Sequence, residues 1–243
     1  MSTLRAYTAV PAICMTICMY TSVAQAQKTE SFFTARQQMI ERQLKGRDIT
    51  NPAVLRAMAE VPRHHFVPAS LQSMAYTDRP LPIGNGQTIS QPYIVALMTQ
   101  LLKVRPDDRV LEIGTGCGYQ AAVLARLANK VYTIEIVQGL ARKAQNLFNE
   151  LGAQNIFVKA GDGFDGWAKK APFDKIILTC AIKEFPPALI AQLREGGRII
   201  APLGSPGSVQ QLVLATKEKG QLKRKQILPV RFVPMTGKAL KNR

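Results

Sequence analysis

Apolar residues follow two different periods along the chain, and the change occurs near residue 109. An amphipathic helix that ends near Gly46 is predicted by five apolar positions at near-helical spacing, Phe32, Phe33, Met39, Ile40 and Leu44. A second helix should begin at Asn51-Pro52 and stop at Pro62, because proline suits only the first turn of a helix. Residues 61–92 are rich in Pro and Gly and lack a clean period, which predicts an ordered loop region that carries function.

From residue 109 onward, short β-branched and apolar runs alternate with helical patterns. Strands are predicted at 110–113, 131–135, 156–159, 175–179 and 198–201, and helices at 119–127, 137–151 and 186–193. Two later strands, 211–215 and 227–233, should flank a turn at 217–220. Such alternation is typical of a parallel sheet with helices on both faces. The chain is therefore predicted to be an α/β protein with a doubly wound, mostly parallel sheet and an N-terminal helical extension.

The first 26 residues have the pattern of a secretory signal peptide. Arg5 precedes a mostly apolar run, residues 6–23, and Ala24-Gln25-Ala26 supplies an A-x-A cleavage pattern. Polar residues within the run disfavour a stable membrane anchor. We therefore expect cleavage before Gln27 and a periplasmic or secreted protein. A retained anchor, a mis-assigned start upstream of Met39 and a cytoplasmic location are the alternatives.

Composition changes this picture only through charge. With 47% apolar and 20% charged residues, the 243-residue chain has the composition of a globular protein with one core. Its formal net charge of +16 suggests an acidic partner, a nucleic acid or an anionic membrane surface. The charge lacks the interleaved aromatic residues of base-stacking surfaces, which favours a solvated basic face and no nucleic-acid partner. It is densest near the C-terminus, where Glu218 is the only acid among Lys217, Lys219, Lys223, Arg224, Lys225, Arg231, Lys238, Lys241 and Arg243.

Cysteine usage argues against a disulfide scaffold or a metal centre. Cys14 and Cys18 lie in the predicted signal peptide, so only Cys117 and Cys180 remain in the mature chain. Without C-x-x-C spacing these two do not form a metal site, and no metal is expected. Both follow predicted strands, and we hypothesise that an oxidising compartment could link them if the strands are neighbours.

The strongest local signal is the segment VLEIGTGCGYQAAVLARL at residues 110–127. Gly114, Gly116 and Gly118 permit positive φ and close approach of a ligand, and the following helix start offers free N–H groups. Dinucleotide enzymes need a third glycine where Tyr119 stands, so NAD is not expected. With Glu112 before the turn, the segment resembles the first motif of class I methyltransferases that bind S-adenosylmethionine. Tight packing of a strand on a helix is the alternative explanation.

Two further acidic residues follow successive predicted strands. Glu135 ends the second strand, where a carboxylate can accept both ribose hydroxyls of a nucleotide-like ligand. Asp162, followed by Gly163, comes after the third strand and can accept from an adenine amino group. Taken singly, Glu135 suits a solvated acid and Asp162-Gly163 an ordinary turn. Together with the glycine turn they predict a cofactor site at the carboxyl ends of three strands, where open α/β sheets bind ligands.

The segment RPLPIGNGQTISQPYIVALM, residues 79–98, resembles the characteristic motif of protein-L-isoaspartate O-methyltransferases. Similar stretches are MIERQL near Met39, VPRHHFVP near Val61, DGFDGW near Asp162, LREGGRIIAPLG near Leu193 and VRFVPMTG near Val230. The resemblance covers about residues 35–237 and implies a class I methyltransferase fold of the Rossmann-like type. We expect one domain, 27–237, with a helical and substrate-loop part (27–100), a cofactor-binding core (101–205) and C-terminal strands (206–237), before a basic tail (238–243).

The resemblance also implies roles for individual residues. Ser90 matches the active-site position, and Thr88, Ile89 and Gln91 should shape the substrate pocket. Cofactor-contacting positions are matched by Glu112, Gly114, Gly116, Gly118, Glu135, Asp162 and Gly163, and Gln211 matches a late polar contact. A helix N-cap before Pro92 is an alternative or additional role for Ser90.

The implied reaction is methyl transfer from S-adenosylmethionine to the free α-carboxylate of an L-isoaspartyl residue in damaged proteins or peptides. Esterification supplies a leaving group, so the ester closes to a succinimide that hydrolyses partly to normal aspartate. A carboxylate, with a reference pKa of about 4, is already ionised at neutral pH and needs no general base. The chemistry can therefore rest on positioning and desolvation. The expected enzyme is a monomer that acts on isoaspartyl proteins.

Two other functions are left open by the residues. The same cofactor motif and basic charge would suit a small-molecule or nucleic-acid methyltransferase, although the fourth predicted strand ends Leu178-Thr179-Cys180-Ala181, without an Asn-Pro-Pro-Tyr element to receive an exocyclic amine. A non-catalytic cofactor-binding relative is the other alternative. The intact Ser90 and the retained acidic positions argue against it.

Overall fold

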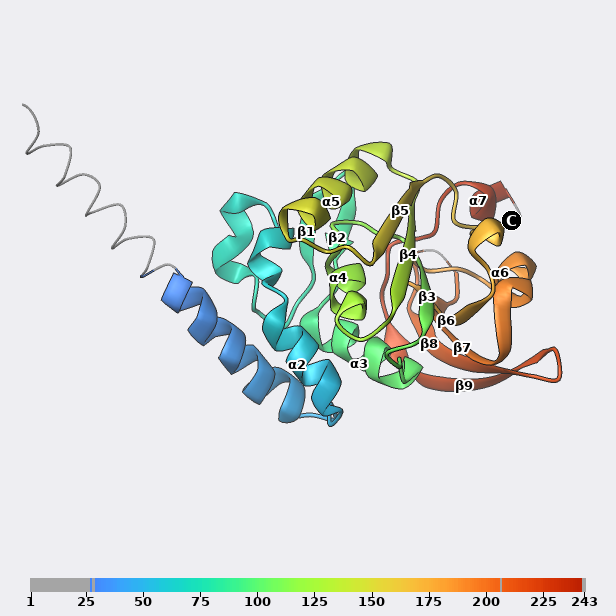
Figure 1. The fold of residues 1–243 in the computed structure, drawn as a ribbon, viewed down its shortest axis with the longest axis horizontal. Coiled ribbons are helices and arrows are strands. Elements are labelled where there is room, and N and C mark those ends of the chain that lie inside the picture. The colour runs from blue at the N-terminus through green and yellow to red at the C-terminus, as the bar shows by residue number, and fades with distance from the viewer. Residues whose placement is uncertain (1–26, 28, 206, 242–243) are drawn as a thin grey trace, which may run out of the picture.

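The computed structural model describes residues 27, 29–205 and 207–241, so the predicted signal peptide, residues 1–26, lies outside the described residues. Helices cover both sides of a central sheet, and a helical extension projects at the N-terminal end (Figure 1). The predicted fold class is therefore confirmed. Among the described helices, none combines the length and apolar character needed to cross a membrane.

Seven strands form the central sheet in the order β5-β4-β3-β6-β7-β8-β9. They are β3 (Arg109–Ile113), β4 (Lys130–Glu135), β5 (Ile156–Ala160), β6 (Phe173–Leu178), β7 (Leu193–Leu203), β8 (Gln210–Glu218) and β9 (Gln221–Val230). The first five strands of that order are parallel, and β8 and β9 continue the sheet antiparallel. Because the chain leaves β3 first toward β4 and later returns to β6, the strand order reverses at β3, where such sheets form a ligand crevice.

Every predicted strand is present, with two differences at the C-terminal end. Strand β7 begins at Leu193, earlier than the expected residue 198. Strand β9 ends at Val230 and does not reach residue 233, because the chain turns away to pair with the segment after β6. There Ala181 N donates to the Val233 carbonyl at 2.8 Å, so residues 233–235 cross the carboxyl end of the sheet.

Alternation of side chains along the strands gives the sheet two buried faces. One face, with Val110 and Val131, is covered by α2 (Pro52–Glu60), α3 (Pro92–Leu102), α4 (Tyr119–Ala125) and α5 (Gln138–Glu150). The opposite face, with Leu111 and Ile113, is covered by α6 (Pro187–Gln192) and Trp167. Both faces are apolar, as expected for the interior of a doubly wound sheet.

The N-terminal part packs against the sheet, and Gln87 and Thr88 near its end line the crevice. Residues 29–38 are α-helical and continue as a π-helical turn, η1 (Met39–Lys45), that ends at Gly46 as predicted. Helix α2 is capped by Asn51, whose side chain accepts from the Ala53 amide at 2.9 Å. The predicted loop region contains short 3₁₀ turns and a hairpin: η2 (Arg63–Phe66), η3 (Ala69–Met74), β1 (Leu81–Gly84) and β2 (Gln87–Ile89). A further 3₁₀ turn, η4 (Ala168–Lys170), precedes β6.

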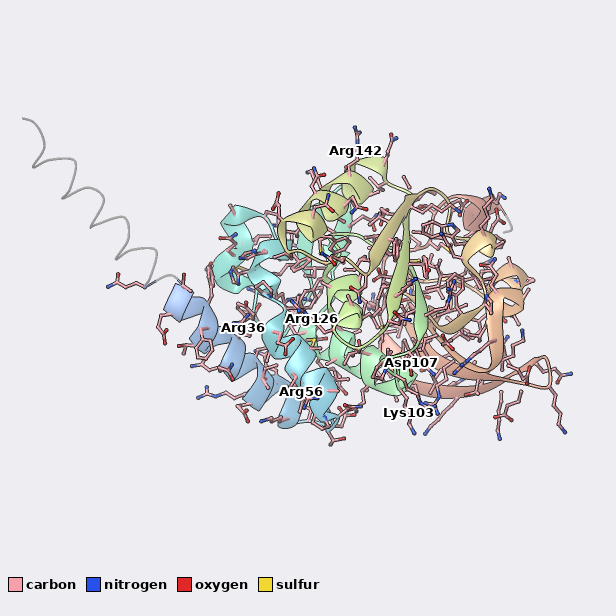
Figure 2. All side chains as sticks on the ribbon, viewed as in Figure 1. Arg36, Arg56, Lys103, Asp107, Arg126 and Arg142 are labelled. Atoms are coloured by element: carbon pink, nitrogen blue, oxygen red, sulfur yellow. The ribbon has the colours of Figure 1, made fainter. Side chains whose placement is uncertain are left out.

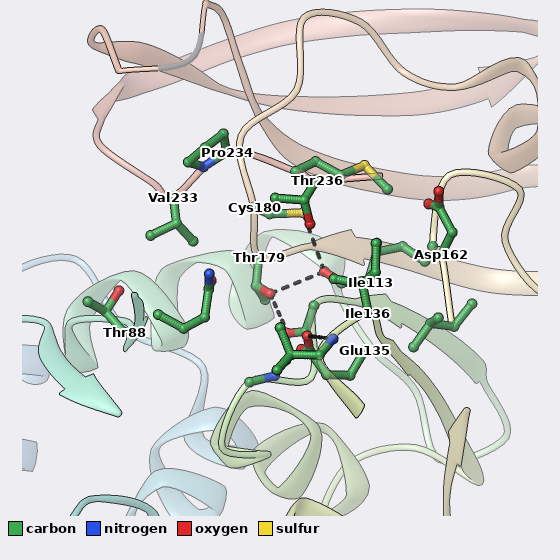
Figure 3. A pocket seen from close by; sticks show the side chains of 17 residues that line it. Thr88, Ile113, Glu135, Ile136, Asp162, Thr179, Cys180, Val233, Pro234 and Thr236 are labelled. Carbon is green, nitrogen blue, oxygen red and sulfur yellow. Dashed lines mark hydrogen bonds between the residues drawn. The ribbon is translucent and has the colours of Figure 1, made fainter. Parts of the chain in front are cut away.

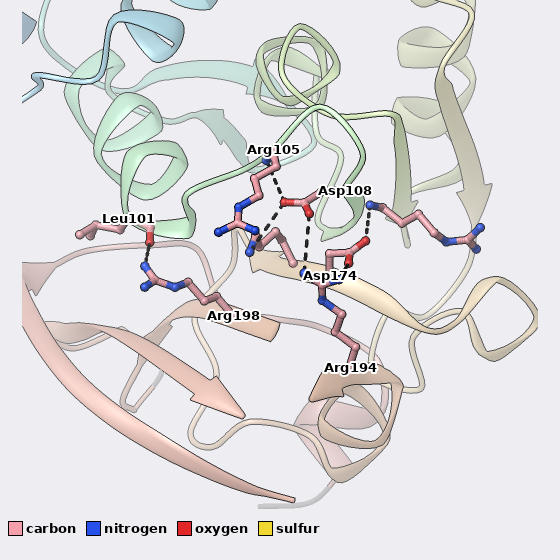
Figure 4. A network of polar contacts seen from close by, with 8 residues as sticks. Leu101, Arg105, Asp108, Asp174, Arg194 and Arg198 are labelled. Carbon is pink, nitrogen blue, oxygen red and sulfur yellow. Dashed lines mark hydrogen bonds and ion pairs between the residues drawn. The ribbon is translucent and has the colours of Figure 1, made fainter. Parts of the chain in front are cut away.

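A partly buried ionic cluster lies at the amino ends of the strands (Figure 4). Asp108 lies 3.7 Å from the Lys175 ammonium, and Asp174 pairs with Arg194 at 2.5 Å. Asp174 also accepts from the Arg109 amide at 2.6 Å. The cluster ties β3, β6 and the start of β7 together at the end of the sheet away from the crevice. Other basic side chains, such as Arg56 and Arg142, project from the helices into solvent (Figure 2).

Candidate active site

A pocket of about 580 Å³, counted to its open mouth, lies at the carboxyl ends of β3, β4 and β6. Figure 3 shows Thr88 on one side of the pocket, Asp162 on the other and Glu135 between them. Its lining includes five residues predicted to contact the cofactor, Gly114, Gly116, Glu135, Asp162 and Gly163.

The glycine turn brings the backbone close to the neighbouring strand. Gly114 has a φ of +97°, and a Cβ atom there would lie 2.5 Å from the Thr179 hydroxyl oxygen. That hydroxyl donates to the Gly114 carbonyl at 2.6 Å, which fixes the turn against the end of β6. Gly163 is equally confined, since its Cβ would lie 2.4 Å from Ile113. Larger residues at either position would displace the turn or close the pocket.

Glu135 is held in place by the backbone at the end of β4. Its Oε2 accepts from the Gly116 amide at 2.8 Å, and its Oε1 accepts from the Val137 amide at 2.9 Å. The side chain is largely buried, yet it lines the pocket. Each carboxylate oxygen can accept a second hydrogen bond, so the pair can receive two neighbouring hydroxyl groups.

Asp162 is connected to the C-terminal segment. Its Oδ1 accepts from the Phe164 amide at 2.9 Å, and its Oδ2 accepts from the Lys238 amide at 2.8 Å. The Lys238 ammonium also pairs with Asp165. The basic tail expected from residue 238 therefore begins as a short helix, α7 (Lys238–Lys241), held against the cofactor pocket.

A second cavity, of about 1090 Å³ to its open mouth, adjoins the first. Ser90, Gln91 and Tyr93 line it, whereas Thr88 and Thr179 line both cavities. A small third hollow beneath Ser90 is lined by Ile89. The N-cap of α3 is Gln91 and not Ser90, so the alternative role of Ser90 as a helix cap is wrong. The predicted acceptor residues thus face a space that opens into the predicted cofactor pocket.

Three predicted cofactor positions do not line this pocket. Glu112 is fully buried behind the turn and accepts from the Thr133 hydroxyl at 2.5 Å. Gly118 starts α4 against Phe148, whose ring would lie 2.5 Å from an added Cβ. Gln211 is exposed on β8, three strands from β3, so the structure does not bring it to the site. We therefore leave Gln211 out of the proposed site.

Other residues of the site were missed in the sequence. Thr179 lies between the two cavities, Ile136 follows Glu135 at the pocket wall, and residues 233–236 cover the pocket. The signal for Thr179 was its place at the carboxyl end of β6, next to the reversal of strand order. The covering segment lies within VRFVPMTG, a stretch that resembles the family, but its pattern does not indicate that it crosses the pocket.

Cys117 and Cys180, the two cysteines in the described part of the chain, are free thiols. Burial raises the pKa of Cys117 to about 11 and that of Cys180 to about 12, so both are protonated near pH 7. Among the described residues, no group of three or more His, Cys, Asp or Glu side chains could hold a metal ion. His64 lies with its Nδ1 2.7 Å from the Tyr76 hydroxyl.

The residues of the first pocket fit S-adenosylmethionine. Glu135 suits the ribose hydroxyls, Asp162 lies at the far side for an adenine amino group, and the Gly114–Gly116 turn leaves room for the amino-acid part. Ile113 and Ile136 supply apolar walls. The fold and this pocket define a class I methyltransferase that uses S-adenosylmethionine.

Comparison with known proteins assigns the family. A sequence model of the protein-L-isoaspartate(D-aspartate) O-methyltransferase family matches residues 34–240. Protein-L-isoaspartate O-methyltransferase 2 of Shewanella sediminis is 56% identical over 214 residues, 88% of each chain. The protein-L-isoaspartate O-methyltransferase of Opitutus terrae is 53% identical over 83% of this chain and 86% of the relative. The chain therefore belongs to the protein-L-isoaspartate(D-aspartate) O-methyltransferase family.

Solved structures agree with this assignment. A protein-L-isoaspartate O-methyltransferase superposes with a TM-score of 0.78 at 30% identity, covering 84% of this chain and 67% of that chain. A Plasmodium falciparum protein in complex with S-adenosyl-L-homocysteine has a TM-score of 0.71 at 24% identity, covering 83% of this chain and 98% of that chain. The second likeness supports the fold alone.

Proposed function

We propose that this chain methylates the free α-carboxylate of L-isoaspartyl residues in damaged proteins and peptides. The observation that carries the proposal is the junction at Thr88 and Thr179, where the cavity of Ser90 opens into the cofactor pocket. An acceptor held at Ser90 would lie beside the methyl donor. The family assignment supports isoaspartate as the acceptor.

The residues of the chain act by binding and orientation. Glu135 and Asp162 hold the cofactor, which supplies an electrophilic methyl group when bound. The Ser90 hydroxyl donates a hydrogen bond to the acceptor carboxylate and orients one oxygen toward the junction. Because that carboxylate is ionised near pH 7, no residue has to remove a proton. Exclusion of water from the junction strengthens the attraction between the anionic acceptor and the cationic donor.

The experiment is transfer of labelled methyl from S-adenosylmethionine to matched peptides that contain L-isoaspartate or L-aspartate. Base-labile label on the isoaspartyl peptide alone is expected. Ser90→Ala should lower kcat/KM by about tenfold or more, which is about 1.4 kcal/mol, the loss of one hydrogen bond to a charged group. Ser70→Ala, on the exposed surface of η3, is the matched control and should leave the rate unchanged. Cofactor binding without transfer to the isoaspartyl peptide would exclude this substrate.

Export is a separate part of the proposal. The A-x-A pattern at residues 24–26 supports removal of a signal peptide and action in the periplasm or outside the cell. Cell fractionation and N-terminal sequencing should find a mature chain that begins at Gln27. A cytosolic chain that begins at Met1 would contradict export. We also propose a monomer, for which light scattering should give the mass of one chain.

A further inference from the structure

Arg63 is a buried arginine directly behind the predicted acceptor residue. It belongs to η2, and its side chain is the largest in the described part of the chain to be fully buried. Its Nε donates to the Ala75 carbonyl and its Nη2 donates to the Ser90 carbonyl, both at 2.7 Å. The guanidinium therefore joins η2, the end of η3 and the Ser90 segment, which are separate in sequence.

The charge of this guanidinium is not neutralised by an acid. Among the described residues, no carboxylate lies within ion-pair distance of Arg63, and its Nη1 has no hydrogen-bond partner. It stacks 4.7 Å from the centre of the Tyr119 ring. Burial raises the pKa of Tyr119 to about 12 and that of Cys117 to about 11, so both neighbours are neutral near pH 7.

Burying a cation without a counterion costs free energy of folding. Holding the Ser90 backbone in place does not by itself require a charged side chain. Burial lowers the pKa of Arg63, but a guanidinium stays protonated in proteins. Backbone carbonyls could be satisfied by neutral donors at a smaller cost of desolvation. The positive charge itself therefore needs an explanation, and the nearby cavity offers one.

The guanidinium lies next to residues that line the small third hollow beneath Ser90. The hollow beneath Ser90 is lined by Cys117 and Tyr119, the two residues that also interact with Arg63. An anion placed at Ser90 would feel the charge of Arg63 through a protein interior of low dielectric constant. Two other cations, Arg47 and Arg231, line the second cavity, which Ser90 also lines. Arg47 is 44% exposed and pairs with Asp78 at 3.2 Å, so solvent and a counterion screen it.

We propose that Arg63 is a positioning residue that makes the acceptor site selective for a carboxylate. It holds the Ser90 backbone through the Ser90 carbonyl, and its unneutralised charge favours an anionic acceptor over a neutral one of the same shape. This inference rests on the proposed function, because it assumes that the acceptor carboxylate binds at Ser90.

Charge selectivity can be measured separately from structure. The probes are a peptide with L-isoaspartate and the same peptide with its α-carboxamide analogue, each titrated into the enzyme with S-adenosyl-L-homocysteine bound. Arg63→Gln keeps hydrogen-bond donors near the Ser90 carbonyl and removes the charge. Arg63→Lys keeps the charge with fewer donors. Arg56→Gln removes one charge from the exposed surface of α2 and is the matched control.

We expect the wild-type enzyme and Arg56→Gln to bind the carboxylate peptide at least tenfold more tightly than the carboxamide peptide. Arg63→Gln should reduce that ratio at least fivefold, and Arg63→Lys should largely restore it. An unchanged ratio in Arg63→Gln, or equal weakening of both peptides, overturns the proposal. If Arg63→Gln does not fold, as judged by binding of S-adenosyl-L-homocysteine, loss of the ratio in folded Arg63→Lys overturns it. Failure of the wild-type enzyme to methylate the isoaspartyl peptide would instead refute the proposed function.

Discussion

Glu112 is expected to hold its proton at neutral pH, and replacement by glutamine tests this directly. Burial raises the pKa of Glu112 to about 8, the hydrogen bond from Thr133 lowers it, and the negative charge of Glu135 raises it. The Oε1 atom is buried without a hydrogen-bond partner among the described residues, as a neutral acid can tolerate better than a carboxylate. Glu112→Gln keeps the shape of the side chain and removes its titration.

The sign of the pH effect follows from proton counting. Between pH 4.5 and about 8 the folded protein keeps a proton on Glu112 that the unfolded chain has lost. The free energy of unfolding should therefore fall as pH rises through this window and fall no further above it. At about 1.36 kcal/mol per pH unit, the whole interval corresponds to about 5 kcal/mol, and the step from pH 5.5 to 7.5 to about 2.5 kcal/mol.

Urea unfolding followed by circular dichroism at pH 5.5 and 7.5 measures this effect. The wild-type protein should lose about 2.5 kcal/mol more than Glu112→Gln between the two pH values. Glu150→Gln, on the exposed surface of α5, should retain the wild-type pH dependence. Parallel pH dependence in wild type and Glu112→Gln would refute the reasoning, because it would mean that folding leaves the proton affinity of Glu112 unchanged.

Three further substitutions separate binding from stability. Glu135→Gln should weaken S-adenosyl-L-homocysteine binding about tenfold or more in calorimetry. The reason is that one of the two backbone N–H donors, Gly116 or Val137, loses its acceptor. Unaltered affinity would remove Glu135 from the cofactor site. Gly118→Ala should lower stability by about 1–3 kcal/mol in urea unfolding, since its Cβ would meet Phe148 at 2.5 Å, whereas Gly139→Ala, with open space around it, should not. Asp174→Asn should cost about 1–2 kcal/mol of stability with unchanged cofactor affinity, and weaker cofactor binding would contradict the separation of the two ends of the sheet.

The sheet and its cofactor edge were predictable because they depend on local patterns. Strands with apolar runs and helices with a period near 3.6 residues can be recognised without knowledge of their partners. The glycine turn, Glu135 and Asp162 follow strand ends, and parallel strands place their carboxyl ends on one edge. One local signal was overlooked: Asn85-Gly86 predicts a two-residue hairpin turn, and both residues have positive φ between β1 and β2.

Contacts between distant segments could not be predicted. The resemblance predicts Gln211 at the site, but side chains alternate between the two faces of β8. Gln211 is exposed, whereas the buried side chain of its neighbour Gln210 accepts from the Phe232 amide. Arg63 reads in the sequence as an ordinary basic residue between Pro62 and His64. Its burial depends on contacts with η3 and the Ser90 segment, which no period or motif within η2 reveals.

Glu112 on β3 and Glu135 on the neighbouring strand β4 show how the fold gives different roles to one residue type. Glu135 leaves its strand at the pocket edge, where backbone N–H groups meet both carboxylate oxygens. Glu112 points toward the face of the sheet that α2, α3, α4 and α5 cover. There the Thr133 hydroxyl donates to one of its carboxylate oxygens. The charge of Glu135 raises the pKa of Glu112, so a neutral Glu112 avoids a second buried negative charge beside the first. Of these two glutamates, therefore, only Glu135 lines the pocket with its carboxylate, whereas Glu112 lies behind the glycine turn as a neutral acid.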